Sequence, residues 1–357
     1  MEKAIFYVLI PVYRAEAFLR DCVASVQAQT VQEFRIVLVD DGSPDGSGAL
    51  CDTLAREDPR IHVLHQENTG PYGARRAAIR YTRAQAGAGD YVLFLDADDS
   101  LKPNAMAVLL DTFRSENCDL VVLGEDKVFA GNVLSPFPAD KAFTGTVTDK
   151  RQLYKIVLQD GWYNPLWKKA VPARLLPEED HPEYYPIRFG EDLLQSLPMY
   201  RDCRKAVFLK DSLYNYTLNP DSATNALGYE KYRCDSTVLR QVREFLRSED
   251  VWTEADFQEY ARWERRLVRF QVWTVAKFRT SIQNREKLLE QIRQDGFYGS
   301  VIDRAPAKDV TLSLMGLGGY TLLCLLGSAA KTLGNLRRTL RRLGRRSEPQ
   351  YYPQGEA

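Results

Sequence analysis

The sequence predicts an α/β protein in which a mainly parallel sheet is flanked by helices and followed by a C-terminal helical appendage. Short apolar runs alternate with amphipathic segments four times, and acidic or glycine-rich loops follow these runs. That order implies βαβ crossovers, which keep the strands parallel and cover the sheet with helices. The 357 residues are 45% hydrophobic and 27% charged, so the chain can bury the cores of about two domains.

Each element of this fold is predicted by its own pattern. The strands are expected where short apolar runs occur, at 4–10, 34–39, 61–64 and 91–95. The helices are expected between them, at 17–27, 47–55 and 72–86; in the first of these, Phe18, Cys22, Val23 and Val26 have amphipathic spacing. Ligands of such sheets bind at the carboxyl ends of the strands, so the loops after the apolar runs are the candidate site.

Charge and cysteine content exclude several classes of protein. The 48 basic and 48 acidic residues balance, which gives no overall field for nucleic acid. The six cysteines form no C-x-x-C pair, so we expect reduced thiols and no structural zinc. The first residues lack the pattern of a signal peptide. We therefore expect the catalytic part in the cytoplasm, with no nucleic-acid partner.

Three carboxylates, Asp96, Asp98 and Asp99, directly follow the apolar run 91–95. Like charges crowded at the end of a buried strand repel one another and lose hydration, unless a cation compensates. A divalent metal carrying a phosphorylated substrate would do so. The alternative is a solvated turn with a helix N-cap, because a helical segment begins near Pro103. This stretch alone leaves both interpretations open.

A second acidic loop, Asp40-Asp41-Gly42-Ser43, follows the run 34–39. A carboxylate here can accept a hydrogen bond from a nucleotide base or a ribose hydroxyl. For Asp40 in isolation, an ordinary Asp-Gly turn is the simpler interpretation. The chain has no G-x-G-x-x-G after its first apolar run and no G-x-x-x-x-G-K-[ST], which removes the main support for a dehydrogenase or a P-loop nucleotidase.

Taken together, the loops resemble the family 2 glycosyltransferases with the GT-A fold. The resemblance covers about the first third of the chain, in the family's order and spacing, through IPVYRAEAFLRDCVASVQAQT (10–30), FRIVLVDDGSPDGS (34–47), NTGPYGARRAAI (68–79) and YVLFLDADD (91–99). Where the family usually has A-R-N-x-G, this chain has Ala74-Arg75-Arg76-Ala77-Ala78. The helix should persist, because alanine favours helix more than glycine does. Contact of Arg76 with the donor is an open question.

The resemblance implies a nucleotide-sugar site at the ends of the first strands. Pro11, Val12 and Tyr13 would line the base, Asp40 would accept from the uracil N–H with Asp41 beside it, and Arg75 would lie close to Asp40.

The resemblance also implies a metal site. Asp96 would hold the ribose, or the metal through water, Asp98 would ligate the metal, and Asp99 would be a neighbour or second choice. Mg²⁺ or Mn²⁺ prefers one or two carboxylates together with diphosphate oxygens, and it would neutralise the charge of the departing diphosphate.

The candidate catalytic residues lie further along the chain, where a shorter segment also resembles the family. An inverting transfer needs one carboxylate to take the proton of the acceptor hydroxyl. The family has an E-D pair after its acceptor loops, and Glu191-Asp192 matches it. We predict Asp192 as the base and Glu191 as an orienting group, against the alternative of two acids that favour a helix N-terminus. Ser222, at the end of an aromatic loop, is expected near the diphosphate.

The segment Trp167-Lys168-Lys169 resembles the family's W-x-K. A buried Trp with a snorkelling Lys is the equal alternative.

The expected organisation has three parts. Residues 1–228 form the GT-A catalytic domain, with a nucleotide-sugar half to about 125 and an acceptor half over 126–228. Residues 229–304 form the helical appendage. In 305–357, an uncharged run between Asp309 and Lys331 precedes seven basic residues with leucines at helical spacing. This tail is expected to lie on the inner face of a membrane. A single membrane span and packing on a partner subunit are the less favoured alternatives.

These observations predict a metal-assisted, inverting transferase that moves a sugar from a nucleotide diphosphate donor, UDP-linked, to a glycan or lipid-linked acceptor. A homo-oligomer is left open. Two rivals remain: a sugar nucleotidyltransferase, which would need a glycine-rich basic loop that 11–17 lacks, and a non-catalytic scaffold of the same fold.

Overall fold

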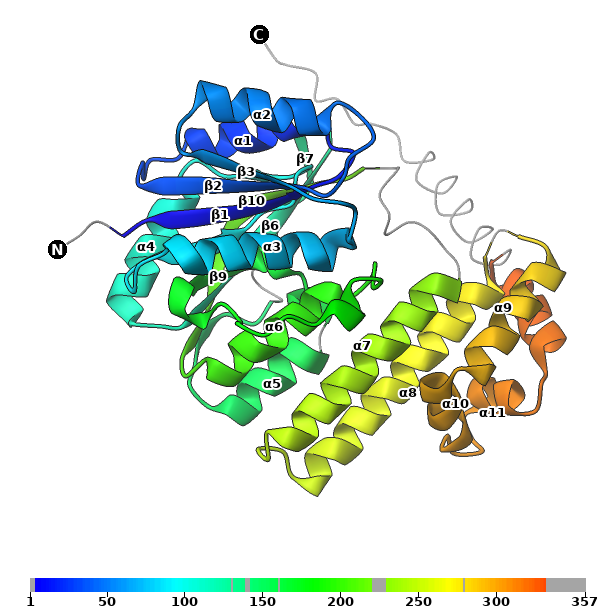
Figure 1. The fold of residues 1–357 in the computed structure, drawn as a ribbon. Coiled ribbons are helices and arrows are strands. Elements are labelled where there is room, and N and C mark those ends of the chain that lie inside the picture. Colours follow the sequence, from blue (N-terminus) through cyan, green and yellow to red (C-terminus); the bar gives the residue numbers. More distant parts are fainter. Residues whose placement is uncertain are drawn as a thin grey trace, which may run out of the picture. The chain divides into compact units, whose positions relative to one another are not determined.

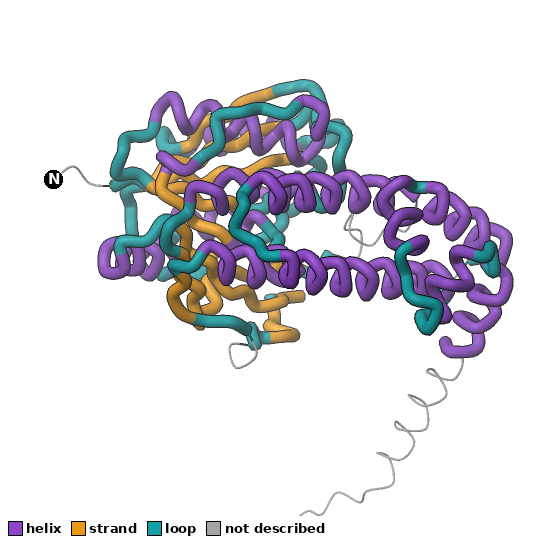
Figure 2. The backbone as a smooth tube through the Cα atoms, turned by 90° about the horizontal axis from the view of Figure 1, so that it is seen from below, coloured by secondary structure: helices purple, strands orange, loops and turns teal. Residues whose placement is uncertain are grey.

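The computed structural model describes residues 4–129, 131–138, 142–159, 161–219, 229–278 and 280–331. The chain divides into two compact units. The first comprises Met1–Leu227 with Thr237–Thr253, and the second comprises Gly228–Ser236 with Glu254–Ala357. The strands lie in the first unit, and the described residues of the second are helices and loops (Figure 2).

One mixed sheet runs through the first unit, in the order β3-β2-β1-β4-β9-β6-β10-β5, with β7 on β6 and β8 on β10. The strands β3, β2, β1 and β4 are mutually parallel, as predicted, whereas β9 is antiparallel to both of its neighbours. Their bounds are β1 Phe6–Val12, β2 Phe34–Asp40, β3 Ile61–His65, β4 Tyr91–Phe94, β5 Ser100–Leu101, β6 Leu120–Phe129, β7 Asn132–Ser135, β8 Gly145–Val147, β9 Lys169–Pro172 and β10 Ala206–Thr217.

Helices cover both faces of the parallel strands, with α1 and α2 on one side and α3 on the other (Figure 1). The helices of the first unit are α1 Leu19–Gln27, α2 Ser47–Glu57, α3 Gly70–Gln85, α4 Ala105–Glu116, α5 Lys150–Gln159 and α6 Glu191–Asp202. Those that follow are α7 Tyr229–Ser248, α8 Glu254–Ala276, α9 Ile282–Gln294, α10 Gly296–Asp303 and α11 Val310–Gly316. Four 3₁₀ turns occupy Gly161–Tyr163, Leu166–Lys168, Ala173–Leu175 and Pro182–Tyr184.

The core explains why the N-terminal apolar runs are strands. In β1, Phe6, Val8 and Ile10 are fully buried in the central cluster, and the intervening Tyr7 and Leu9 are buried as well. A strand buried on both faces reads as a continuous apolar run, which is typical of parallel sheets under helices. Each such side chain contributes roughly 1.5–3 kcal/mol relative to exposure, so the strands that carry the loops are rigid supports.

The division of the chain differs from the expected boundary at 228. Residues 237–253, which include most of α7, belong to the first unit. The reason is apolar packing: Val238, Val242, Phe245 and Leu246 are buried, and the ring of Phe245 lies 5.3 Å from that of Tyr154 in an edge-on contact.

The uncharged run after Asp309 forms no membrane span within the described residues. It is broken after α11 by Gly318, whose φ is 72°, and a second helix begins at Tyr320. None of the described helices is long and apolar enough to cross a membrane. Leu312, Met315, Leu323 and Cys324 of this run are fully buried. The seven basic residues predicted to follow the run begin with Lys331, and the rest lie outside the described residues.

Candidate active site

A buried arginine joins three carboxylates that lie far apart in the sequence. Arg75 of α3 is 4% exposed. Its Nη2 lies 2.8 Å from Asp96 Oδ1, and its Nη1 lies 2.9 Å from Glu191 Oε1 and 2.7 Å from Asp192 Oδ1. The structure therefore brings the acid that follows β4 together with the acid pair that begins α6.

This pairing corrects one expectation about Arg75. The family resemblance implies that it lies close to Asp40, but the partners of its guanidinium are Asp96, Glu191 and Asp192. Asp40 Oδ1 instead accepts from the Ser43 N–H at 3.0 Å, and its Oδ2 lies 3.0 Å from His65 Nδ1. Asp40 thus has partners of its own, and the loop 40–43 is held without Arg75.

The two acids of α6 differ in exposure. The side chain of Asp192 is 21% exposed, whereas that of Glu191 is 10% exposed. Burial, together with repulsion from Asp192, raises the pKa of Glu191 to about 7. Asp192 is therefore the more accessible member of the pair.

Gly190 forms the turn that brings these two acids into the first turn of α6. It has a φ of 77°, a conformation that L side chains rarely adopt, and it starts α6 directly before Glu191. A Cβ at this position would also lie 3.3 Å from Val238 Cγ2. The turn thus depends on glycine, and the acids enter the first turn of a helix, where the macrodipole favours negative charge.

The three acids after β4 have separate environments. Asp99 is 3% exposed, and it accepts from the Tyr214 hydroxyl and the Thr217 N–H, both at 2.7 Å. Burial and repulsion from Asp96 raise the pKa of Asp99 to about 8, and the same two causes raise that of Asp98 to about 6. Asp99 thus anchors β10, while Asp98 is half-buried.

A divalent metal fits this arrangement best at Asp98. Among the described residues, no group of three or more His, Cys, Asp or Glu side chains converges to hold a metal. The donor set is therefore one or two carboxylates, which is what Mg²⁺ takes when phosphate oxygens complete its shell. A cation at Asp98 would also relieve its repulsion from Asp96, so the residues present fit the ion.

The predicted nucleotide loops end side by side. Val12 at the end of β1 pairs in register with Asp40 at the end of β2, and the side chain of Tyr13 follows, 45% exposed. Burial would raise the pKa of Asp40, but hydrogen bonds from Ser43 and His65 hold it below its usual value. Asp40 is therefore an anionic acceptor at the edge where a base would lie.

Asp41 accepts hydrogen bonds from the backbone at the start of α3, which was not predicted from the sequence. Its carboxylate accepts from the Thr69 N–H at 2.9 Å and from the Gly70 N–H at 2.8 Å. These are donors at the start of α3, which have no partner within the helix. Asp41 thus fixes the beginning of the helix that carries Arg75.

An aromatic stack behind the acids was also not foreseen. Trp167 lies 4.4 Å from the ring of Tyr214, stacked on it, and Tyr214 accepts from the Asp96 N–H at 3.2 Å. Lys169 is fully buried, and its Nζ donates to the carbonyls of residues 163, 164 and 165 at 2.8, 3.0 and 2.7 Å. The W-x-K segment therefore contains a buried Trp and a Lys that does not snorkel. Of the predicted site residues, Ser222 lies outside the described part.

Arg76 points away from the carboxylates that Arg75 joins. It is 1% exposed, and its Nη atoms donate to the carbonyls of Pro177 and Glu178 at 3.1 and 3.0 Å. Adjacent helical residues project about 100° apart, so the two arginines serve different sides of α3. The departure from the usual Asn thus fixes the segment that follows β9.

Part of the chain matches a known protein family. Residues 7–170 match the family described as Glycosyl transferase family 2. Among curated relatives, the uncharacterized glycosyltransferase EpsJ of Bacillus subtilis (strain 168) is 30% identical over 61% of this chain and 62% of its own length. The uncharacterized glycosyltransferase YibD of Escherichia coli (strain K12) is 23% identical, over 83% of this chain and 86% of its own length. The chain spans less than two thirds of the first three curated relatives that it matches.

Solved structures show the same fold. A crystal structure of Staphylococcus aureus TarS 1-349 in complex with UDP-GlcNAc has a TM-score of 0.62 at 20% identity, and the match covers 94% of this chain and 91% of that one. TarS 1-349 in complex with UDP has a TM-score of 0.61 at 19% identity, over 98% and 94% of the two chains.

Proposed function

We propose that this chain, whose residues 7–170 match Glycosyl transferase family 2, is a glycosyltransferase that transfers a sugar with inversion from a UDP-linked donor to a hydroxyl of a glycan or lipid-linked acceptor. The observation that carries this proposal is the cluster around Arg75, which brings Asp96 and the acid pair Glu191-Asp192 to one place. An inverting transfer needs donor-binding groups and one base close together, and this cluster supplies both.

The donor lies across the ends of β1, β2 and β4. Pro11, Val12 and Tyr13 line the base, and Asp40 accepts from the uracil N–H. Asp96 takes the ribose. The UDP-GlcNAc complex of a protein with this fold supports a UDP-linked donor.

Asp192 acts as the base. Its carboxylate accepts the proton of the acceptor hydroxyl as that oxygen attacks the anomeric carbon. Arg75 holds Asp192 in place and Glu191 beside it. Asp98 would hold Mg²⁺ or Mn²⁺, which would supply neutralisation of the diphosphate charge.

The acceptor meets the protein at a membrane surface. Leu322, Leu325 and Leu326 are each more than two-fifths exposed, at the i, i+3, i+4 spacing of one helix face, and the basic residues of the sequence follow them. Sedimentation with vesicles tests this part: binding to anionic and not to neutral vesicles is expected, weakened by Leu325→Asp. Equal sedimentation of both proteins would contradict it.

The function is tested by titration calorimetry with UDP- and GDP-sugars, with and without Mn²⁺. A UDP-sugar should bind more tightly with the metal, and Asp98→Asn should weaken metal-dependent binding by about tenfold or more. Asp111→Asn, an exposed acid on α4, is the matched control and should bind normally.

The results of this titration separate the rivals. If no nucleotide sugar binds, the proposed function is wrong. Binding without any hydrolysis or transfer would favour the non-catalytic scaffold, and formation of a sugar nucleotide from a nucleoside triphosphate would favour the nucleotidyltransferase.

A further inference from the structure

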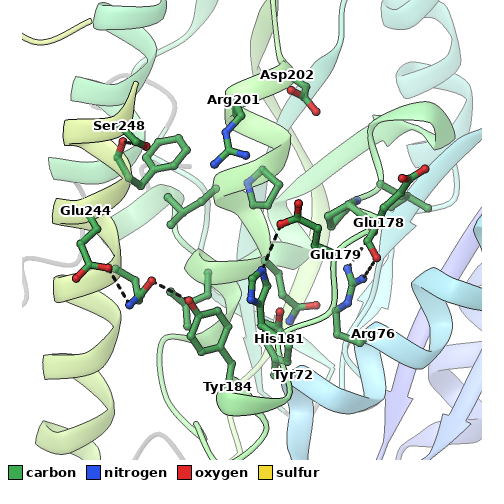
Figure 3. Close-up of a pocket in the computed structure, with 18 of the residues that line it drawn as sticks. Tyr72, Arg76, Glu178, Glu179, His181, Tyr184, Arg201, Asp202, Glu244 and Ser248 are labelled. Carbon is green, nitrogen blue, oxygen red and sulfur yellow. Dashed lines mark hydrogen bonds and ion pairs between the residues drawn. The ribbon is translucent and has the colours of Figure 1, made fainter. Parts of the chain in front are cut away.

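A cavity lies apart from the proposed reaction centre. It has a volume of about 590 Å³ and is lined by α3, by the segment 174–184, by α6 and by the part of α7 that belongs to the first unit (Figure 3). None of the residues assigned above to the base, the donor or the metal lines it. Its volume is within the range of sites that take small organic ligands.

The arginines that line this cavity are already paired with carboxylates. Each of its four arginines faces a carboxylate: Arg76 Nε is 3.5 Å from Asp180, Arg201 is 3.0 Å from Glu249, and Arg83 and Arg174 pair with Glu178 and Asp119. A phosphate-binding pocket would need arginines with free charge. The cavity, which Glu179, Asp202 and Glu244 also line, is therefore suited to a polar ligand without negative charge.

The side-chain amide of Gln195 indicates which chemical group a ligand of this cavity would carry. It lines the cavity and is 2% exposed, and within the described part of the chain neither Oε1 nor Nε2 has a hydrogen-bond partner. A buried amide without partners costs about 1–3 kcal/mol. It requires one donor and one acceptor at the same place, and a hydroxyl group provides both.

Aromatic rings complete the lining. Tyr72 is buried, with its ring 5.5 Å from that of Tyr184 in an edge-on contact, and His181 lies 5.1 Å from Tyr184. The labelled side chains of Figure 3 show these three residues together at one end of the cavity. Apolar ring faces beside unpaired hydrogen-bonding groups suit a ligand that carries hydroxyls on a ring with C–H faces, which is a sugar.

We propose that this cavity binds a neutral glycan at a site separate from the donor site. Gln195 follows Asp192 by three residues on α6, and Arg76 follows Arg75 on α3, so a glycan here contacts the same two helices that carry the reaction centre. The inference rests on the proposed function in taking this glycan as part of the acceptor. Its binding is measured without any transfer, so the two can fail separately.

The probes are neutral oligosaccharides of two to four hexose or N-acetylhexosamine units, together with matched uronic-acid and phosphorylated oligosaccharides. Binding to the full chain is followed by saturation-transfer NMR and calorimetry in the absence of any nucleotide. A neutral oligosaccharide should bind, and Gln195→Leu should weaken it by about tenfold or more. Gln294→Leu, an exposed amide on α9, is the matched control and should leave binding unchanged.

Folding of the Gln195→Leu variant is measured in parallel. Its midpoint of unfolding in urea should equal or exceed that of the parent, because an unpartnered buried amide is removed. The proposal is overturned if no neutral oligosaccharide binds, if only charged ones bind, or if the folded variant keeps the parent's affinity. Loss of glycan binding with normal UDP-sugar binding would support it.

Discussion

Replacing Arg75 with glutamine tests the ion-pair cluster of the proposed reaction centre. The side chain is nearly inaccessible, and its three partner carboxylates lie within 2.9 Å. Removing one partner of a buried ion pair costs about 3–5 kcal/mol, because the remaining charge is left buried. With three carboxylates around a single cation, the loss in the free energy of unfolding should reach this range near neutral pH.

The loss should also depend on pH. Without the guanidinium, the pKa values of Asp96 and Glu191, which burial already raises, should rise further in the folded state. The folded variant then binds more protons than the unfolded chain, so its stability falls as pH rises. The penalty of Arg75→Gln should therefore be larger at about pH 8 than at about pH 5.

Urea unfolding of the parent and the variant at both pH values measures this difference. The matched control is Arg80→Gln on the same helix, whose side chain is 53% exposed and pairs with Asp180. Its effect should stay within about 0.5 kcal/mol. A loss for Arg75→Gln below about 1 kcal/mol, or one that does not change with pH, would refute the buried cluster.

Three other predictions follow from the site. Asp192→Asn should lower kcat by about 10²- to 10⁴-fold with UDP affinity kept, as measured by donor hydrolysis and calorimetry. His65 has a raised pKa through its hydrogen bonds to Asp52 and Asp40, so it adds stability below about pH 6.5 that is lost as pH rises through its folded pKa. His65→Gln should remove this small pH dependence, less than about 1 kcal/mol at a half-exposed site, in urea unfolding. Lys169→Met should cost about 1–3 kcal/mol in the same assay, because three carbonyls lose their donor.

Each of these predictions has a contrary outcome. Full turnover in Asp192→Asn, with Asp111→Asn as the control, would remove Asp192 from the role of base. A pH dependence unchanged in His65→Gln would assign it to other groups. A Lys169→Met variant as stable as the parent would mean that segment 163–165 keeps its structure without the hydrogen bonds from Lys169.

The parallel strands could be predicted because each one is marked by a short apolar run in its own sequence. The runs 34–39 and 61–64 became β2 and β3 within one residue at each end, since a strand buried on both faces must be apolar throughout. The acidic loops could be placed at one edge because parallel strands end together. The antiparallel β9 between β4 and β6 could not be foreseen, because no local pattern specifies which strand fills a position in a sheet.

Long-range side-chain partners were the part that the sequence could not provide. Arg75 and Glu191 are 116 residues apart, so their contact depends on how α6 returns to α3. The same holds for Tyr214 and Asp99, 115 residues apart. Resemblance named Arg75 as a site residue and placed it near the wrong acid, because a motif records which residues occur and not which of them touch.

The configuration of the first sugar released from an α-linked UDP-sugar tests the central claim most directly. With water in place of the acceptor, Asp192 would activate a water molecule on the face opposite the diphosphate, so ¹H NMR should show the β-anomer appearing first, before mutarotation. The same signal should be lost in Asp192→Asn. If the α-anomer appears first, or if the variant releases sugar at the parent's rate, inverting transfer with Asp192 as the base is contradicted.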